Sequence, residues 1–182
     1  NRRVSLEHAA REVRYAFLGA VAGAQGADAI AVAHTSDDQA ETVLLHIIRG
    51  SGLAGLRGME AVARRTIGGV DSVIVRPFLG VSGVETRAYC SAKGLRPRED
   101  ETNRSPEMRR NKLRLDLIPR LEEYNPAVRD ALLRLSRSVA HDLRYLESNL
   151  DDVWGEAVQV CDGQVSIEKG VFLWLEPALQ RH

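Results

Sequence analysis

The chain has few cysteines, and their placement excludes several kinds of site. Its 182 residues include two, Cys90 and Cys161, and neither belongs to a Cys-x-x-Cys pair. Two isolated thiols cannot form the disulfide framework of a small secreted protein, and their spacing argues against a zinc or iron–sulfur site. No apolar run approaches the ~20 residues that span a bilayer, and no signal-peptide pattern opens the chain. We therefore expect a cytoplasmic protein without a membrane segment or a protein-bound metal.

The chain also lacks net charge, because 25 Lys and Arg balance 25 Asp and Glu. As a whole it does not have the charge expected of a nucleic-acid-binding protein. The local balance differs between Arg87 and Arg120, where ten basic residues accompany five acidic ones. Such a stretch can attract phosphates, but it can equally be the solvated face of a helix, and composition favours neither reading.

Helical and strand patterns alternate over the first part of the chain. A first helix over residues 5–24 is predicted by an apolar stripe at helical spacing, formed by Leu6, Ala9, Ala10, Val13, Phe17, Ala20 and Val21. A short apolar segment at 28–33, bounded by polar residues, is typical of a strand buried on both faces. A second helix is predicted after it, with Ser36 as its N-cap, Gln39 in the capping-box position and its end at Gly50.

A second strand and a third helix extend this alternation. Residues 50–70 are punctuated by glycine and predict a loop with one short helical turn. Residues 72–76 predict a second buried strand, and a Ser-x-x-Glu capping box opens a helix over 82–93. The order α-β-α-β-α predicts an α/β fold: an incomplete Rossmann-like parallel sheet with flanking helices.

The second half of the chain is predicted to be mostly helical. Residues 107–121 predict a helix with basic residues on its outer face, and Asn125-Pro126 is a strong helix-start signal. Apolar residues at spacings of three and four then predict one helix of roughly 30 residues, which could be a linker packed on its own chain or the coiled coil of a homodimer. A hairpin turning at Asp162-Gly163 follows. The expected units are the sheet domain, the long linker helix and the start of a second α+β domain, at 1–123, 124–157 and 158–182.

The most informative stretch is His34-Thr-Ser-Asp-Asp-Gln-Ala-Glu-Thr42. Its three carboxylates follow a buried strand, at the edge of the sheet where α/β proteins bind ligands. Helix capping explains Asp37 and Asp38, whose charges favour the positive end of the helix dipole. It does not explain Glu41, which lies one turn later on the same face, where like charges repel unless an ammonium or Mg²⁺ lies between them. The motif predicts a site for a cation, a phosphate or an amine.

Other residues near this motif give weaker signals. His34 ends the strand and could reach the same ligand, or it could be a hydrogen-bonded structural residue. Gly50, Gly52, Gly55 and Gly58 could let backbone approach a ligand closely. They form no Walker or dinucleotide fingerprint, so they do not define a site alone.

Taken together, these motifs resemble the tRNA(Ile)-lysidine synthases, which belong to the PP-loop (N-type) ATP pyrophosphatase superfamily. Asp-Asp-Gln-Ala-Glu-Thr and Arg-Gly-Ser-Gly are the most specific of them. The resemblance implies an ATP-dependent ligase that forms a C–N bond: it adenylates the wobble cytidine of a CAU-anticodon tRNA(Ile), and the ε-amine of free L-lysine then attacks, giving lysidine and AMP. The resembling stretches run in family order, at Ala10–Leu18, Ala33–Thr42, Arg49–Leu56, Val75–Leu79, Glu99–Asn103, Arg109–Arg114 and Leu121–Pro126.

The resemblance also implies roles for matching residues and makes ATP and Mg²⁺ the expected cofactors. Paired carboxylates suit a cationic amine, and the planar fork of arginine suits phosphate. The implied residues are, for catalysis, Asp38, Glu41 and Arg110; for lysine, Arg14, Asp38 and Glu41; for the nucleotide, His34, Asp37, Gly50, Ser51 and Gly52; and for tRNA, Arg109, Arg110 and Arg114.

Two departures from the family pattern stand out. Thr35 replaces the second histidine of the usual His-His pair, and no Ser-Gly-Gly-x-Asp-Ser loop for pyrophosphate is found. We therefore expect the 182 residues alone to be unable to use ATP. Two alternatives stay open: a related PP-loop enzyme such as a tRNA thiolase, and a non-catalytic tRNA-binding module. The missing Cys-x-x-Cys pair speaks against thiolases that use one.

Overall fold

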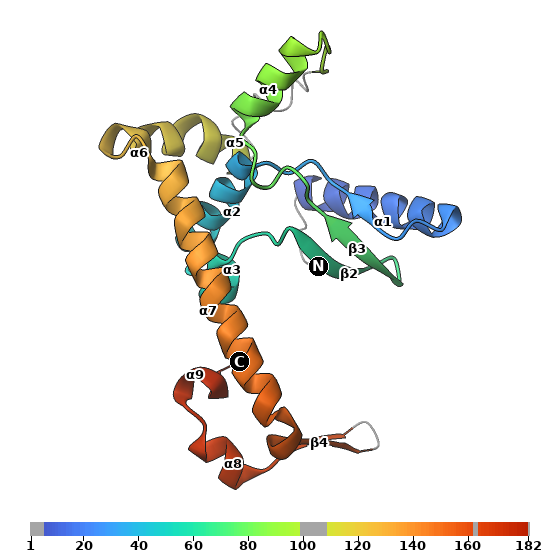
Figure 1. Ribbon diagram of the computed structural model, residues 1–182, viewed down its shortest axis with the longest axis vertical. Helices are drawn as coiled ribbons and strands as arrows, with labels where there is room; N and C mark the ends of the chain where they lie inside the picture. The colour runs from blue at the N-terminus through green and yellow to red at the C-terminus, as the bar shows by residue number, and fades with distance from the viewer. Residues whose placement is uncertain (1–5, 99–108, 162–163, 182) are drawn as a thin grey trace.

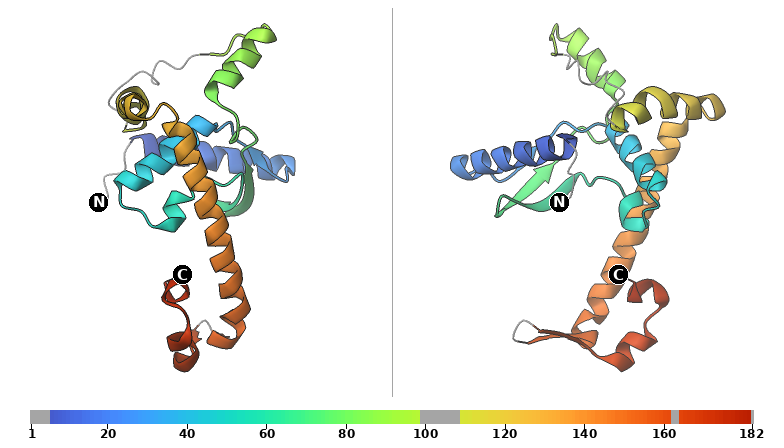
Figure 2. Two further views of the ribbon diagram at one scale, coloured as in Figure 1. Left: turned by 60° about the vertical axis from the view of Figure 1, so that its left-hand side comes forward. Right: turned by 180° about the vertical axis from the view of Figure 1, so that it is seen from behind.

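The computed structural model describes residues 6–98, 109–161 and 164–181. Two groups of elements lie at opposite ends of one long helix, α7 (Val128–Ala157), as Figures 1 and 2 show. None of the described helices combines the length and apolar composition needed to cross a membrane. The predicted 30-residue helix is confirmed, since α7 has 30 residues.

The described part of the main sheet has the strand order β1-β3-β2. Its parallel pair joins β1 (Ile30–Ala31) to β3 (Val70–Val75), with Ile30 opposite Ile74, which confirms the predicted α/β class. The prediction for residues 50–70 is right in part: the short helical turn is confirmed as α3 (Leu53–Leu56), but the expected loop after it contains β2 (Val62–Ile67), which pairs antiparallel with β3. Two arginines on the exposed positions of β2 obscured its alternation. The Gly68-Gly69 turn, with φ of 58° and 83°, was a usable hairpin signal.

The first helix, α1 (Leu6–Gln25), packs on this sheet through a face that the sequence did not indicate. Val13 and Phe17, in the predicted stripe, are 71% and 66% exposed. The opposite face contacts the sheet instead, because Gly19 has no side chain: a Cβ there would lie 3.0 Å from Cγ2 of Ile67. The residues of α1 that pack against the sheet core are Tyr15, Leu18 and Ala22.

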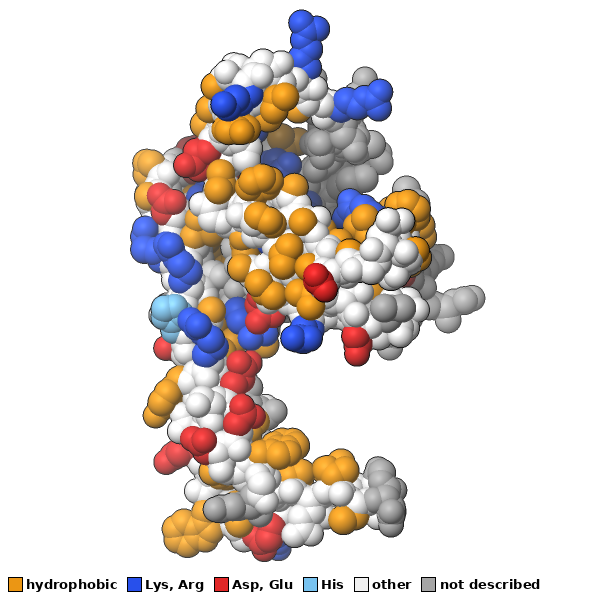
Figure 3. Space-filling model, turned by 45° about the vertical axis from the view of Figure 1, so that its right-hand side comes forward, with side chains coloured by type: hydrophobic (Ala, Val, Ile, Leu, Met, Phe, Trp, Pro, Cys, Tyr) orange, Lys and Arg blue, Asp and Glu red, His pale blue; other side chains and the backbone are white. Residues whose placement is uncertain are grey.

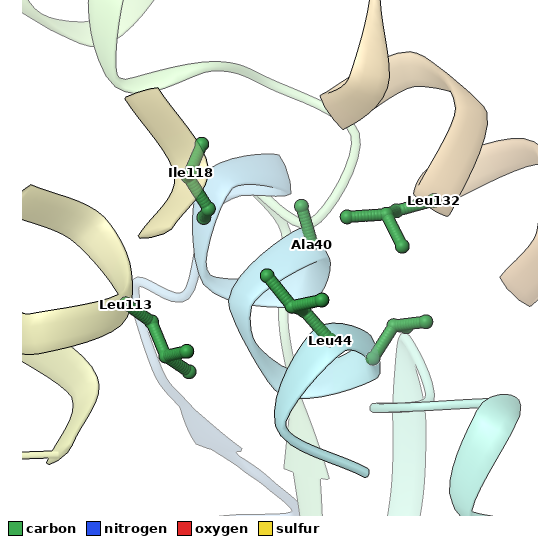
Figure 4. Close-up of a cluster of buried hydrophobic side chains, with 6 residues drawn as sticks. Ala40, Leu44, Leu113, Ile118 and Leu132 are labelled. Atoms are coloured by element: carbon green, nitrogen blue, oxygen red, sulfur yellow. The ribbon is translucent and has the colours of Figure 1, made fainter. Parts of the chain in front are cut away.

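A second core lies around α2 (Ser36–Ile48), which is covered by α7 and by the segment before it (Figure 4). The predicted helix over 107–121 is not continuous. It consists of α5 (Arg109–Lys112), the π-helical segment η2 (Leu113–Leu117) and α6 (Ile118–Tyr124). The buried residues of this core are Ala40, Val43, Leu44, Leu113, Ile118 and Leu132.

The helix ends agree only in part with the predicted caps. In α2 the N-cap is Thr35, not Ser36, and Asp38 takes the capping-box place predicted for Gln39. The Asp38 carboxylate accepts hydrogen bonds from the backbone N–H of Thr35 at 2.8 Å and from its hydroxyl at 3.0 Å. The Ser-x-x-Glu box of α4 (Gly83–Ala92) is confirmed, as is the helix end at Gly94.

The remaining elements lie at or beyond the ends of α7. This helix begins at Val128, two residues later than predicted, and the Asn125 side chain accepts a hydrogen bond from the Ala127 N–H just before it. The predicted hairpin is confirmed by its two antiparallel strands, whereas its turn at 162–163 and the 99–103 motif lie outside the described residues. The elements after α7 are β4 (Val158–Cys161), β5 (Gln164–Ile167), α8 (Lys169–Trp174) and α9 (Pro177–Gln180).

A buried glutamine ties α2 to α7. The Gln39 side-chain nitrogen lies 2.9 Å from the Ser136 hydroxyl of α7 and 3.1–3.2 Å from the carbonyls of Met59 and Arg57. Its side-chain oxygen accepts the Met59 N–H at 2.8 Å. Because the amide bonds with two separate segments, residues 57–59 and α7, Gln39 fixes the position of α2.

Substitution of Gly58 by Ala tests this tie. Gly58 has φ of +71°, and a Cβ there would lie 2.7 Å from Nε2 of Gln39, which its hydrogen bonds hold in place. We expect Gly58→Ala to lower the free energy of unfolding by about 3 kcal/mol, from backbone strain plus the clash. In the control Gly68→Ala, φ is also positive but the space is open, so a loss of about 1 kcal/mol is expected. Urea denaturation measures the free energy of unfolding of both variants. Equal losses would show that the Gln39 side chain moves away from the new methyl group without cost.

Candidate active site at the start of α2

The acidic motif lies where two parallel strands end. His34 follows β1, Arg76 follows β3, and α2 begins between them with its carboxylates at its first turn. The carboxyl ends of parallel strands are the usual ligand edge of an α/β sheet. The predicted position of the motif, at a strand-to-helix junction on this edge, is confirmed.

Asp38 and Glu41 share one guanidinium, which comes from the π-helical segment. Arg114 donates through Nε to Oε1 of Glu41 at 2.6 Å and places Nη2 3.3 Å from Oδ1 of Asp38. The sequence predicted that these like charges need a cation between them. In the structure the chain supplies this cation itself, from a residue 73 positions away.

Glu41 is the most buried charged side chain of the site, with 0% of it exposed. Burial raises its carboxyl pKa, and the hydrogen bond and charge of Arg114 oppose that rise. One carboxylate oxygen, Oε2, is buried and has no hydrogen-bond partner among the described residues. A buried acceptor without a donor is destabilising. The arrangement therefore leaves one acceptor unsatisfied, and an ammonium group is a donor that would satisfy it.

Asp37, by contrast, joins three helices. Its Oδ2 accepts the N–H of Gly83, the first residue of α4, at 2.8 Å, and its Oδ1 lies 3.4 Å from Arg129 of α7. A Cβ at Gly83 would lie 2.8 Å from the same carboxylate. The structure thus gives Asp37 a role in holding helices together, and its nucleotide-binding role stays a prediction.

The basic residues of the site come from α5 and η2. Arg110 donates to the Thr42 hydroxyl at 2.8 Å, and this hydroxyl donates to the backbone carbonyl of Asp38 at 2.7 Å. Arg109 begins α5. Arg110 and Arg114 therefore lie beside the carboxylates on neighbouring turns. Segments of π-helix are often found at functional sites, and this one places Arg114 over α2.

His34 is uncharged at neutral pH. Burial lowers its pKa to about 4; Asp38 acts in the opposite direction, and Arg76, Arg11 and Arg110 lower it further. Its Nδ1 is buried and has no hydrogen-bond partner among the described residues. A neutral imidazole surrounded by arginines can contact an anionic ligand without adding charge of its own.

This shift predicts that stability depends on pH. Because the folded-state pKa lies below the unfolded value of 6.5, the stability that neutral His34 contributes is fully present above pH 6.5 and is lost as the pH falls toward 4. We expect this residue to lower the free energy of unfolding by about 2 kcal/mol between pH 7.5 and pH 5. The raised pKa of Glu41 acts with the opposite sign. The difference in urea midpoint between the parent and His34→Gln isolates the histidine, and parallel pH profiles would contradict the prediction.

Several predicted residues are not brought to the carboxylates. Gly50, Ser51 and Gly52 follow the other end of α2, about 20 Å from its start at 1.5 Å per residue. Arg14 is exposed on α1, where its guanidinium lies 5.9 Å from the centre of the Tyr15 ring. Their predicted roles in nucleotide and lysine binding stay predictions.

Sequence reasoning missed four residues of the site. Arg76 could have been found, because it directly follows a predicted strand at the ligand edge. Arg11 lies one helical turn before the predicted Arg14 and, unlike Arg14, acts on the pKa of His34. Thr42 and Arg129 gave no local signal, since their partners Arg110 and Asp37 are 68 and 92 positions away.

Comparison with known proteins places the chain in a family. The model of the PP-loop domain matches residues 1–121, so the chain belongs to the PP-loop domain family. It is 43% identical over 180 residues to a tRNA(Ile)-lysidine synthase of Dehalococcoides mccartyi. The aligned region covers 98% of this chain and 38% of that protein. A tRNA(Ile)-lysidine synthase of Thermus thermophilus is 46% identical over 79% of this chain and 26% of its own length. The chain thus spans less than two fifths of these relatives.

A solved structure agrees in fold. The U34-tRNA thiolase NcsA from Methanococcus maripaludis, with its [4Fe-4S] cluster, superposes with a TM-score of 0.55 at 18% identity. The superposition covers 78% of this chain and 47% of the thiolase. At this identity the likeness supports the fold alone.

Proposed function

We propose that the protein containing this chain is a cytoplasmic tRNA(Ile)-lysidine synthase. It uses ATP to adenylate the wobble cytidine of the CAU-anticodon tRNA(Ile) and joins L-lysine to the activated carbon. The observation that carries this proposal is the free Oε2 of Glu41, a buried acceptor beside Asp38 at the ligand edge of the sheet. The lysidine synthases that match nearly the whole chain support it.

The carboxylates fit the ε-amine of lysine. An ammonium has three donors, and the free Glu41 oxygen accepts one of them. The amine attacks only after it loses a proton, and a carboxylate with a raised pKa is a better acceptor for that proton. Asp38 and Glu41 are therefore proposed as catalytic and lysine-binding residues, with Arg14 at the edge of the site. Holding the amine and the adenylate in attack geometry is the main expected catalytic effect.

The basic side of the site fits an anionic nucleotide. Neutral His34 and the nearby Arg110 can lie against the adenylate, and Asp37 and the 50–52 loop keep their proposed nucleotide roles. Each of the three carboxylates of the motif is already within 3.4 Å of an arginine nitrogen. We therefore expect Mg²⁺ to be held mainly by the phosphates of ATP.

The tRNA is expected to contact the basic residues of α5 and η2 and the adjoining part of α7. Figure 3 shows Lys and Arg side chains on the upper part of the molecule and acidic side chains along the lower stem. Along α7, the four arginines Arg129, Arg134, Arg137 and Arg144, with Asp130 and Asp142 among them, precede Glu147, Asp151 and Asp152. The proposed tRNA-binding residues of the sequence motif are Arg109, Arg110 and Arg114.

Replacing Arg110 with Ala tests the phosphate contact. We expect weaker tRNA binding and a plot of log affinity against log salt whose slope is smaller by about 0.7–0.9, the effect of one phosphate contact. Arg120→Ala is the matched control, because Arg120 is exposed on α6 and pairs with Asp116 at 2.7 Å. A slope identical to that of the parent would remove Arg110 from the phosphate-binding residues.

Two further activities compete with this proposal. A thiolase that holds an iron–sulfur cluster needs several cysteine thiolates, whereas this chain offers Cys90 on α4 and Cys161 on β4, on two separate elements. A non-catalytic tRNA-binding module would not need a buried acidic site. The packing of α7 on α2 of the same chain favours the linker role over a coiled-coil homodimer. We keep 1–123, 124–157 and 158–182 as the proposed ATPase portion, linker and start of the substrate-binding domain.

The deciding experiment is incorporation of labelled lysine into CAU-anticodon tRNA(Ile) with ATP, using the complete protein. We expect lysine-dependent release of AMP. Incorporation of sulfur instead of lysine, or no reaction with either, would favour one of the two alternatives. The 182 residues assayed alone are expected to give no product, because they contain no pyrophosphate-binding loop of the Ser-Gly-Gly-x-Asp-Ser type.

A further inference from the structure

Arg76 is a buried cation that forms no ion pair with a carboxylate in the described part of the chain. It directly follows β3 and is 5% exposed. Its Nη1 donates to the Glu60 carbonyl at 2.6 Å, while Nε is buried and has no hydrogen-bond partner among the described residues. No carboxylate of the described residues forms an ion pair with it. An unpaired buried charge costs several kcal/mol, so a buried arginine normally has an anion beside it.

The groups around Arg76 add further positive charge to its unpaired charge. Burial lowers its pKa, and the charges of Arg11 and Arg65 act in the same direction, although a guanidinium stays protonated in proteins. The Tyr15 hydroxyl lies close enough to Arg76 to raise the pKa of the guanidinium, yet it is buried and makes no hydrogen bond of good geometry with the described residues. Both residues therefore have unused donors at one place, between α1 and the ends of the strands.

This place is the part of the site around His34, and it does not include the Arg114–Glu41 pair. The charges of Arg76 and Arg11 both act on His34, which follows the neighbouring strand β1. The donors thus lie on the ligand edge of the sheet, next to the imidazole and away from the Arg114–Glu41 pair. Small anions bind at such positions in α/β proteins.

We propose that Arg76, together with Arg11 and the Tyr15 hydroxyl, binds a phosphate group of the nucleotide. The identity of the nucleotide rests on the proposed function, whereas the anion site does not. A guanidinium that is only 5% exposed can be reached by a small anion but not by the backbone of a folded RNA. The planar fork of Arg76 supplies charge-assisted hydrogen bonds, and the phosphate supplies the missing counter-charge.

A purely structural role for Arg76 makes a different prediction. Its hydrogen bond to Glu60, and the backbone bond from its N–H to the Ala61 carbonyl at 2.8 Å, tie the segment before β2 to the end of β3. If this were its whole role, substitution would change stability and leave anion binding unchanged. Stability and anion affinity must therefore be measured separately.

The test is binding of inorganic pyrophosphate and of AMP to the complete protein by calorimetry, without tRNA or lysine. For Arg76→Gln we expect roughly tenfold weaker binding, the loss of one charge-assisted hydrogen bond, with partial recovery in Arg76→Lys. Arg64→Gln is the control, because it removes one charge from the same region at an exposed position of β2. Unchanged affinity in a folded Arg76→Gln protein would overturn the proposal.

Two further measurements cover the other outcomes. If Arg76→Gln does not fold, Arg11→Gln decides, since Arg11 is exposed: it is expected to weaken pyrophosphate binding several-fold, and no change would overturn the proposal. Loss of affinity for an oligoribonucleotide with unchanged pyrophosphate binding would assign the phosphate to RNA and overturn the nucleotide assignment. Pyrophosphate binding that depends on Arg76 in a protein that incorporates no lysine would keep this site and refute the proposed function.

Discussion

Replacing Glu41 with Gln in the complete protein is expected to lower kcat/KM for lysine by about 100-fold, while affinity for tRNA changes by less than about twofold. The amide keeps the shape of the side chain but removes the charge that an ammonium needs in a buried place, and a hydrogen bond to a charged group contributes about 1.5–3 kcal/mol. The measurement is the rate of lysidine formation against lysine concentration, with tRNA affinity measured separately.

The control for this substitution is Glu147→Gln. Glu147 is an exposed acid on α7 that lies 3.4 Å from Arg57, and neutralising it removes the same charge far from the motif. Its kinetics are expected to match those of the parent. If Glu41→Gln left the lysine dependence unchanged, Glu41 would have to be removed from the lysine site, and its burial would be explained by Arg114 alone.

The second large effect is on stability, from Arg114. Arg114→Met is expected to lower the free energy of unfolding by about 3 kcal/mol, because it leaves the Glu41 carboxylate buried without its partner. The loss is set by the carboxylate and not by the arginine, whose own side chain is partly exposed. Chemical denaturation at neutral pH measures it.

A double-mutant cycle separates this explanation from a simple loss of packing. Combining Arg114→Met with Glu41→Gln removes the stranded charge, so about half or more of the lost stability should return. Arg120→Met is the matched control: the same exchange in an exposed i,i+4 pair is expected to change stability by less than about 0.5 kcal/mol. Additive losses in the cycle would show that Glu41 and Arg114 are not coupled.

Local patterns in the sequence were sufficient where local interactions determine the structure. The capping box of α4 and the length of α7 follow from residues three or four apart, and both were predicted, whereas the N-cap of α2 was predicted one residue too late. The same holds for the position of the acidic motif, because a buried strand followed by polar residues indicates the ligand edge of a sheet.

The predictions that failed depend on contacts between distant residues. The face of α1 that meets the sheet is determined by the close approach of Gly19 to Ile67, not by the more apolar stripe. The cation between Asp38 and Glu41 comes from η2, and no periodicity predicts a π-helical segment. Even Gln39, read as a capping residue, is turned inward because Ser136 offers it a partner 97 positions away.

The attachment of α7 to α2 has a mechanical consequence. Arg129 and Ser136, which lie about two turns apart on α7, both bond with the first turns of α2, so this part of the long helix cannot turn independently of the acidic motif. From Ser136 to Ala157 the helix extends a further ~32 Å at 1.5 Å per residue, as far as the β4–β5 hairpin. A tilt of about 5° at the attachment would move the hairpin by about 3 Å over that length. A small tilt of α7 at the acidic motif would thus be amplified at the elements beyond its far end.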